Sequence, residues 1–220
     1  MLVGDGRCHN CRDLEPEFAR ALSYGEYDEA LRSLIHLLKY EAVLPVAPVL
    51  GGMLAHTIGE LLPECGDSRP LIIPVPLHRG KCSDRGFNQA ELIARAAVRR
   101  LPQALDLVTG ALIRRRATLS QVGLPREQRI ANIRDAFRVR DPRQVRDRVV
   151  ILVDDVMTTG TTLSECARVL KQAGAEKVLA ATVARAFQGA APQDAAARTE
   201  PESAKGESEA REEVAVATSV

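Results

Sequence analysis

Residues 150–162 read VILVDDVMTTGTT, and this stretch decides the fold. Its first four residues belong to the apolar, mostly β-branched run Val149–Val153, which is typical of a strand covered on both faces. A helical apolar pattern over residues 163–173 follows, Gly174 is a suitable helix stop, and Val178–Val183 is again apolar. Strand, helix and strand in this order predict a βαβ unit and therefore a parallel sheet.

Apolar periodicity on the N-terminal side of this unit predicts the other elements of an α/β domain. Helices are expected over residues 27–40, 50–62 and 87–101, and strands over 71–76 and 106–112. The polar residues 78–85 follow a strand that ends in proline, and we expect them to form a functional loop. The fold class is therefore α/β, with helices flanking a parallel sheet.

Length and composition divide the chain into one domain and two flanking regions. The 220 residues, 45% of them hydrophobic, are enough for one full domain, which we place at residues 25–187. Residues 1–24 are polar and lack a clear period, so we interpret them as a linker or the remnant of another unit. Residues 188–220 are mostly Ala, Glu, Ser, Thr and Pro, and this composition predicts a disordered tail.

The charges are unevenly distributed, although the formal net charge is only +1. Residues 78–148 contain seventeen Lys or Arg and seven Asp or Glu. Such an excess of positive charge suits a phosphorylated ligand, nucleic acid, or both. The alternative interpretation is that these arginines cover solvated helix surfaces.

The cysteines and the hydropathy of the sequence indicate the cellular compartment in which we expect the protein. The five cysteines are an odd number, and no charged-then-apolar signal segment precedes them, so we expect a reducing cytoplasm. No uninterrupted apolar run reaches the roughly 18 residues that span a bilayer. We therefore expect a cytoplasmic protein that does not insert into a membrane.

The residues after Val153 have the chemistry of a sugar-phosphate site. Asp154 and Asp155 place like charges together at a strand end, which costs stability unless hydroxyls, amides or a cation engage them. A vicinal diol or a magnesium-bound sugar would do so. A loop rich in hydroxyls follows the two acids and leads into a helix; it consists of Thr158, Thr159, Gly160, Thr161 and Thr162. The hydroxyls of this loop and the consecutive backbone N–H groups at the helix N-terminus can bind a phosphate. The alternative is an ordinary βα turn in which Asp and Thr act as caps.

The stretch resembles the phosphoribosyl pyrophosphate (PRPP) binding motif of type I phosphoribosyltransferases: an apolar strand, two acids, two apolar residues and a Thr/Gly-rich loop. Other blocks are similar to the ComF family of phosphoribosyltransferase-like proteins, from about residue 25 to 185. These blocks are His36–Tyr40, Pro74–Arg79, Arg85–Ala90 and Gln121–Leu124, with Arg129 and Asn132 following at helical spacing. The resemblance implies the Rossmann-like sheet of type I phosphoribosyltransferases.

The resemblance also implies roles for individual residues. Asp154 and Asp155 would meet the ribose 2′ and 3′ hydroxyls, residues 158–162 would hold the 5-phosphate, and magnesium would bind chiefly through the pyrophosphate. Basic side chains from other loops would neutralise that pyrophosphate. Our candidates for this role are Lys39, Arg79, Lys81 and Arg85. A flap over the reacting centre would contain Arg114, Arg115, Arg116, Gln121 and Gly123.

The expected function is PRPP binding with magnesium, followed by phosphoribosyl transfer with release of pyrophosphate, in connection with DNA uptake or utilisation (competence). Some relatives place an acid at the position of Thr158, where it acts as a base, so the sequence identifies no catalytic base here. The alternative is a non-catalytic PRPP sensor or a module that binds single-stranded DNA, with a competence helicase as a partner. The 3% aromatic content weighs against single-strand binding.

A zinc site is doubtful. The ComF family commonly begins with a zinc ribbon of two Cys-x-x-Cys pairs, and this sequence has one pair, Cys8 and Cys11. Structural zinc takes four ligands. Either the sequence starts within the ribbon, a partner chain completes the site, or the metal has been lost, and we favour loss.

Overall fold

The computed structural model describes residues 2–3, 7–8, 15–101, 105–116 and 126–187. Within them a five-stranded sheet has the order β3-β9-β8-β4-β5, and every neighbouring pair is parallel. The strands are β3 (Arg20–Glu26), β4 (Leu71–Pro74), β5 (Asp106–Leu107), β8 (Val149–Met157) and β9 (Lys177–Arg185). Two smaller antiparallel pairs are β6 (Leu112–Arg114) with β7 (Phe137–Val139), and β1 (Leu2–Val3) with β2 (Arg7–Cys8).

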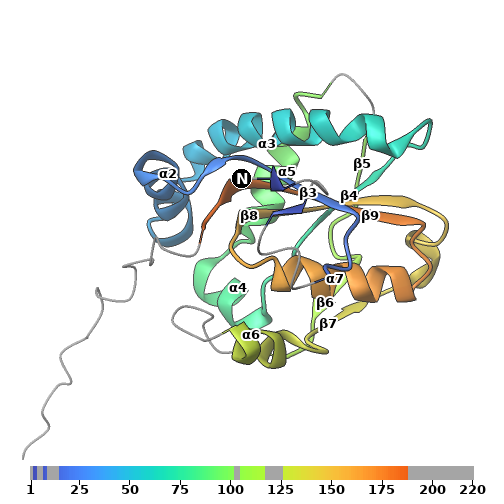
Figure 1. The fold of residues 1–220 in the computed structure, drawn as a ribbon. Helices are drawn as coiled ribbons and strands as arrows, with labels where there is room; N and C mark the ends of the chain where they lie inside the picture. The colour runs from blue at the N-terminus through green and yellow to red at the C-terminus, as the bar shows by residue number, and fades with distance from the viewer. Residues whose placement is uncertain (1, 4–6, 9–14, 102–104, 117–125, 188–220) are drawn as a thin grey trace, which may run out of the picture.

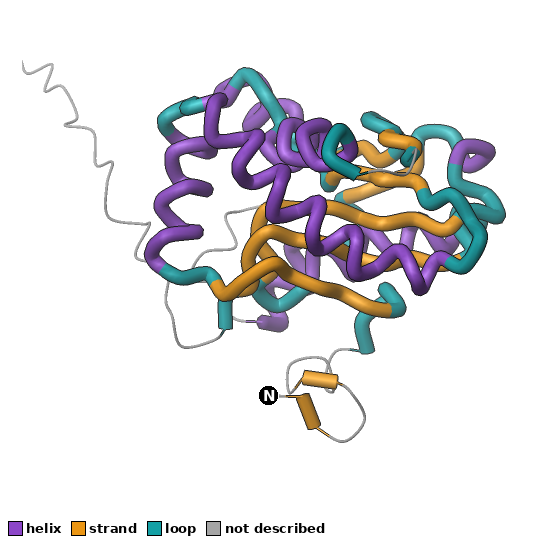
Figure 2. The backbone as a smooth tube through the Cα atoms, turned by 90° about the horizontal axis from the view of Figure 1, so that it is seen from above, coloured by secondary structure: helices purple, strands orange, loops and turns teal. Residues whose placement is uncertain are grey.

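Helices cover both faces of the sheet (Figure 1). One face carries α2 (Glu29–Tyr40), α3 (Ala47–Leu61) and α5 (Gln89–Val98), and Figure 2 shows helices lying across the strands from above. The other face carries α7 (Thr161–Gln172) and the β6–β7 hairpin, with α6 (Arg126–Ile133) between its strands. The short helix α4 (Arg79–Arg85) follows β4.

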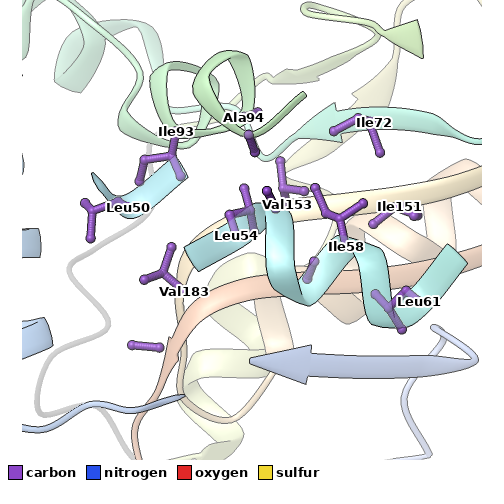
Figure 3. Close-up of a cluster of buried hydrophobic side chains, with 14 of the residues drawn as sticks. Leu50, Leu54, Ile58, Leu61, Ile72, Ile93, Ala94, Ile151, Val153 and Val183 are labelled. Atoms are coloured by element: carbon purple, nitrogen blue, oxygen red, sulfur yellow. The ribbon is translucent and has the colours of Figure 1, made fainter. Parts of the chain in front are cut away.

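The alternation of side chains along β8 divides the core into two clusters. Ile151 and Val153 pack with α3 and α5, in the cluster shown in Figure 3, while Val150 and Leu152 pack under α7 and the hairpin. Residues 150–153 are fully buried. A strand that is covered on both faces requires a continuous apolar sequence, and β8 begins with one.

One helical segment among the described residues, Leu44–Cys65, is long and apolar enough to cross a membrane, with a mean hydropathy of 1.2. It contains α3, and the side chains of Leu50, Leu54 and Ile58 lie in the cluster of Figure 3. Its apolar side chains therefore form part of the core of this domain.

The predicted α/β class and the predicted βαβ unit are confirmed, since β8, α7 and β9 follow one another and β8 pairs in parallel with β9. The strand is longer than expected. It continues to Met157, because β9 still pairs with it beyond Val153, for example through Asp154 and Thr182. The two carboxylates consequently belong to the strand itself rather than to a loop after it.

Three other predictions are wrong in detail. Residues 79–85 form helix α4, because the His78 side chain accepts a hydrogen bond from the N–H of Gly80 and Gly86 ends the helix in the left-handed region. The single strand predicted for 106–112 is two strands, β5 and β6, belonging to different sheets. The predicted domain start at residue 25 is too late, since β3 begins at Arg20 and pairs with β9.

Helix α3 approaches α5 so closely that a side chain would not fit at Gly51. A Cβ atom there would lie 2.4 Å from the Cβ of Ala96 and 3.0 Å from the backbone of Ala96 and Ala97. The two helices can pack at this distance because position 51 is glycine.

We therefore predict opposite effects for one substitution at two glycines of α3. Gly51→Ala should lower the free energy of unfolding by about 1–3 kcal/mol because it overpacks the α3–α5 contact. Gly59→Ala should raise it by about 0.5–1 kcal/mol, since alanine favours the helix and its Cβ would meet nothing within 4 Å. Urea unfolding of both variants checks this, and equal effects of the two substitutions would contradict it.

Candidate functional site

In open α/β sheets, ligands bind in a crevice at the carboxyl ends of two neighbouring strands, and β4 and β8 are such a pair. These strands are neighbours, but the chain leaves β4 toward β5 on one side and leaves β8 toward β9 on the other. Where connections diverge in this way, the carboxyl ends of the two strands line a binding site. Asp154 and Asp155 lie at the carboxyl end of β8, so the fold places them in this crevice.

Asp155 is buried and ion-paired with Lys39 at the end of α2. Its Oδ1 accepts a hydrogen bond from the N–H of Val156 at 2.8 Å, and its Oδ2 lies 2.5 Å from Lys39 Nζ. Oδ2 has no hydrogen bond of regular geometry within the described structure, so the Lys39 ammonium is its compensating charge. Burial raises the pKa of Asp155, but Lys39, together with hydrogen bonds involving Asp154 and Val156, outweighs burial, and the net pKa is lowered. Burial likewise lowers the pKa of Lys39, and Asp155 reverses this to a net rise.

Asp154 has different surroundings from Asp155. Its Oδ1 accepts a hydrogen bond from the N–H of Asp155 at 2.9 Å. Burial and the charge of Asp155 together raise the pKa of Asp154 well above its ordinary value of 3.8, and Lys39 offsets only part of this. Burial and then Asp154 also raise the pKa of the Cys166 thiol on α7. Asp154 is thus the carboxyl group that needs a hydroxyl donor or a cation in order to ionise.

The threonine-rich loop leads directly from β8 into α7. Gly160 has a φ of 76° and is the N-cap of α7, so the cap offers no side-chain acceptor to the first-turn N–H groups. The hydroxyls of Thr159 and Thr161 lie 2.8 Å apart, and Thr158 is exposed. Phe18 packs against this loop, since a Cβ on Gly160 would lie 3.5 Å from its ring. First-turn N–H groups at a helix N-terminus provide an anion site.

The other two helices at the crevice bring basic candidates to the same end of the sheet. The Arg85 guanidinium lies 5.5 Å from the centre of the Tyr40 ring and donates to Gln89 Oε1 at 2.7 Å. Helices α2 and α4 therefore meet next to the Lys39–Asp155 pair. The predicted candidates Arg79 and Lys81 lie in α4, and their side chains are outside the described part of the structure.

The β6–β7 hairpin supplies Arg114 on the other side. Arg114 pairs with His78 in a parallel bridge, so the hairpin touches the connection between β4 and α4. Its guanidinium lies 5.4 Å from the centre of the Phe137 ring. Burial lowers the pKa of Arg114, and nearby Cys166 and Asp154 oppose that change.

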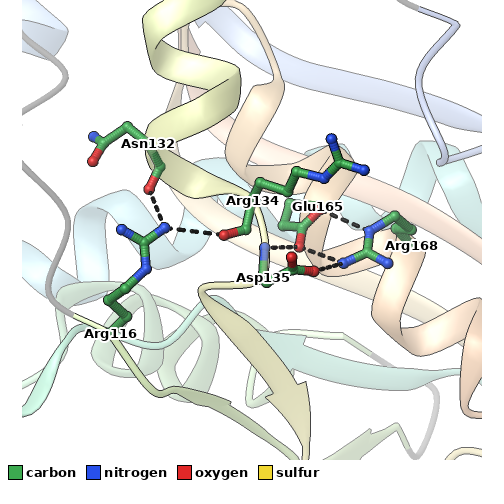
Figure 4. Close-up of polar contacts among 6 residues, drawn as sticks. All are labelled: Arg116, Asn132, Arg134, Asp135, Glu165 and Arg168. Carbon is green, nitrogen blue, oxygen red and sulfur yellow. Dashed lines mark hydrogen bonds and ion pairs between the residues drawn. The ribbon is translucent and has the colours of Figure 1, made fainter.

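The remaining predicted flap residues have different outcomes. Arg115 is exposed. Arg116 donates to the carbonyl oxygens of Asn132 and Arg134 at the end of α6 (Figure 4), and its flap role stays a prediction. Gln121 and Gly123 lie outside the described residues.

Comparisons with known proteins identify the family. The sequence model of the phosphoribosyl transferase domain matches residues 88–209. "DNA utilization protein YhgH" of Escherichia coli (strain K12) is 34% identical over 178 residues, which are 78% of this chain and 74% of the relative. "Competence protein F" of Haemophilus influenzae is 32% identical over 189 residues, 81% of this chain and 78% of that protein. The chain belongs to the ComF family of phosphoribosyltransferase-like proteins.

Membership in the ComF family confirms the resemblance seen in the sequence. A solved hypoxanthine phosphoribosyltransferase from Staphylococcus aureus aligns with a TM-score of 0.39 and 11% identity over 63% of this chain and 64% of that one, a similarity too weak to carry an argument. The two residues expected to hold zinc stay a prediction: Cys8 ends β2, and Cys11 is outside the described residues. Among the residues that the structure describes, no three His, Cys, Asp or Glu side chains gather as metal ligands.

Several residues of this site were not predicted from the sequence. Phe18 lies in the segment interpreted as a linker, and nothing in its local pattern marks it as a support for residue 160. His78 was expected in a loop and instead caps α4 and contacts the hairpin. The pairing of Lys39 with Asp155 joins positions far apart in sequence, so no local spacing indicates it.

Removing one partner of the Lys39–Asp155 pair should destabilise the protein strongly. Lys39→Met leaves the carboxylate of Asp155 buried without its counter-charge, and we expect the free energy of unfolding to fall by about 3–5 kcal/mol. The double variant Lys39→Met/Asp155→Leu should recover most of this loss, because an apolar pair replaces the ion pair. Urea unfolding at neutral pH measures both values. A double variant as unstable as the single one would show that the pair is not the cause.

The raised pKa of Asp154 predicts how stability depends on pH. Protonated Asp154 is favoured in the folded state, so its contribution is complete below 3.8 and is lost as pH rises through the higher folded-state pKa. The free energy of unfolding of the wild type, relative to Asp154→Asn, should therefore fall as pH rises above 3.8. Parallel pH curves for the two proteins would contradict the assignment. Asp141→Asn, at a half-buried carboxylate paired with Arg143, is the control for the same substitution.

Proposed function

We propose that this ComF-family protein binds PRPP at the crevice between β4 and β8. The observation that carries the proposal is the juxtaposition of Asp154 and Asp155, at the end of β8, with a loop of hydroxyls that enters the N-terminus of α7. Carboxylates suit the ribose diol, and the helix N-terminus suits the 5-phosphate. The ribose diol and the 5-phosphate belong to one small ligand, PRPP. A site that offers carboxylate acceptors for the diol and backbone N–H donors for the phosphate therefore fits this ligand.

The ionisation of Asp154 connects the ligand to the site. Asp154 is a half-buried acid with a raised pKa, and a further donor or a cation would stabilise its carboxylate form. Ribose hydroxyls are such donors. Binding of PRPP would supply such donors to Asp154, whereas Asp155 is already compensated by Lys39.

Magnesium fits this proposal as a companion of the ligand. The described residues contain no cluster of three ligands that would form a cage, and Lys39 already occupies Asp155. Mg²⁺ in nucleotide and phosphate sites is held by one or two carboxylates together with substrate phosphates. Asp154 could hold it jointly with the pyrophosphate, where the cation would supply charge neutralisation of the leaving group. Arg85 and Arg114 border the same space.

Transfer is the activity that we propose for the bound PRPP. An acceptor would attack C1 of the ribose, the bond from C1 to the pyrophosphate oxygen would break, and pyrophosphate would leave with the bonding electron pair. The proton on the attacking atom of the acceptor must reach a base, and Thr158 offers none, so a different atom of the acceptor or solvent would take it. The names of the relatives support a role connected with DNA utilisation or competence.

A binding role without transfer is the second candidate. Thr158 is exposed at the position where a base would act, and this observation favours PRPP sensing. Arg138 in β7 and Arg140 just after it are both exposed, which suits contact with the phosphates of single-stranded DNA.

Assays of pyrophosphate release over a panel of nucleobases separate the two candidates. Turnover supports transfer. Oligonucleotide affinity that falls steeply with salt, without turnover, supports the second role.

Calorimetry tests the binding proposal directly. PRPP with Mg²⁺ should give measurable heat with the wild type. Asp154→Asn and Thr162→Val should each weaken binding by about tenfold or more, as expected for lost hydrogen bonds to charged groups. Asp141→Asn should bind like the wild type. Absence of heat with the wild type would overturn the proposed function.

A further inference from the structure

A buried carboxylate on α7 lies within one helical turn of the proposed phosphate loop. Glu165 is 8% exposed and stands four residues after Thr161, and Arg168 stands three residues further on. Positions i, i+4 and i+7 lie on one face of a helix. The helix terminus that would receive the phosphate and the Glu165–Arg168 pair are thus parts of one rigid element.

Both oxygens of the Glu165 carboxylate accept hydrogen bonds from within the protein (Figure 4). Arg168 binds it with two donors, Nε to Oε2 at 2.8 Å and Nη2 to Oε1 at 2.7 Å. Oε1 also accepts the backbone N–H of Asp135 at 2.8 Å. A bidentate pair with an additional backbone donor is both strong and geometrically specific.

Asp135 is held at its backbone and at its side chain. Arg168 Nη2 donates to Asp135 Oδ1 at 2.9 Å, in addition to the bond between Glu165 and the Asp135 N–H. Asp135 has a φ of 56°, a left-handed conformation that a residue other than glycine adopts only at some cost. Asp135 stands between the end of α6 and the start of β7, so its conformation sets how the chain enters the hairpin.

Further contacts link this point to Arg114. The Arg115 N–H donates to the carbonyl of Ala136 at 2.8 Å, and Arg114 is the register partner of Phe137. Arg116 holds the carbonyl oxygens at the end of α6. A continuous set of contacts therefore runs from α7 through Glu165, Arg168 and Asp135 to the strand that carries Arg114.

We propose that Glu165 and Arg168 are positioning residues that couple occupancy of the phosphate loop to the β6–β7 hairpin. The inference rests on the proposed function, because the ligand at the N-terminus of α7 is PRPP. The pair touches no ligand in this proposal. It fixes the hairpin to α7, so that ordering of the helix terminus by the phosphate also orders the strand that carries Arg114.

Hydrogen exchange of the full-length chain, with and without PRPP and Mg²⁺, tests the coupling. In the wild type, the ligand should slow exchange both in the first turn of α7 and in β6 and β7. In Arg168→Met, protection of α7 should persist while ligand-induced protection of the hairpin falls at least about fivefold, the lower range of measured coupling between sites. Arg168→Lys should restore little, since lysine cannot form the bidentate contact. Arg143→Met, which removes an exposed ion pair, should behave like the wild type.

The outcomes separate the coupling from the proposed function. If the ligand protects α7 but not the hairpin in the wild type, or protects the hairpin equally in Arg168→Met, the coupling is refuted and PRPP binding stands. If the wild type neither binds PRPP in the calorimeter nor shows protection, both fall. Should Arg168→Met fail to fold, Glu165→Gln keeps the side-chain shape while removing the charge, and a hairpin response equal to that of the wild type in this variant would also refute the coupling.

Discussion

A negative charge at the end of the central, apolar strand is the constraint on which this structure depends. β8 is covered on both faces, and a carboxylate at its end loses most of its hydration. The ion pair with Lys39 makes Asp155 tolerable there, and it requires that α2 end at one particular place beside the sheet. Among the residues that the structure describes, Asp154 has no equivalent ion pair. One acid thus serves the fold, and the other is available for a ligand.

The helices are arranged around the two acids, with one group beside Asp155 and another beside Asp154. α2 and α4 meet through Tyr40 and Arg85 on the side of Asp155, whereas α7 and the hairpin gather on the side where Asp154 acts on Cys166 and Arg114. The crevice is consequently basic on both sides and acidic at its centre. That is the charge distribution expected of a site for a sugar that carries phosphates at both ends.

Much of the fold was predictable from the sequence, because a buried parallel strand and an amphipathic helix have strong local patterns. The run from Val149 to Val153 and the helix after Gly160 are of this kind. The local signal failed where a tertiary contact decides the structure. β8 extends to Met157 because β9 pairs with it, and α4 forms because His78 and Gly86 cap it. In the site, Asp154 and the threonines were predicted from their chemistry, but Phe18 and the contact of Lys39 with Asp155 were not. Those contacts join residues more than a hundred positions apart, and one sequence carries no record of them.

The edge strand β3 has a consequence for how the chain folds. Its neighbour in the sheet is β9, and the Ser23 and Thr182 hydroxyls that meet at 2.7 Å are 159 residues apart in sequence. Closing a loop of this size is slow compared with forming a local helix. During synthesis β3 leaves the ribosome first and has no partner until β9, the last strand of the sheet, has emerged. The domain therefore completes its sheet only after β9 has been synthesised, and until then β3 is an unpaired strand to which other chains could attach.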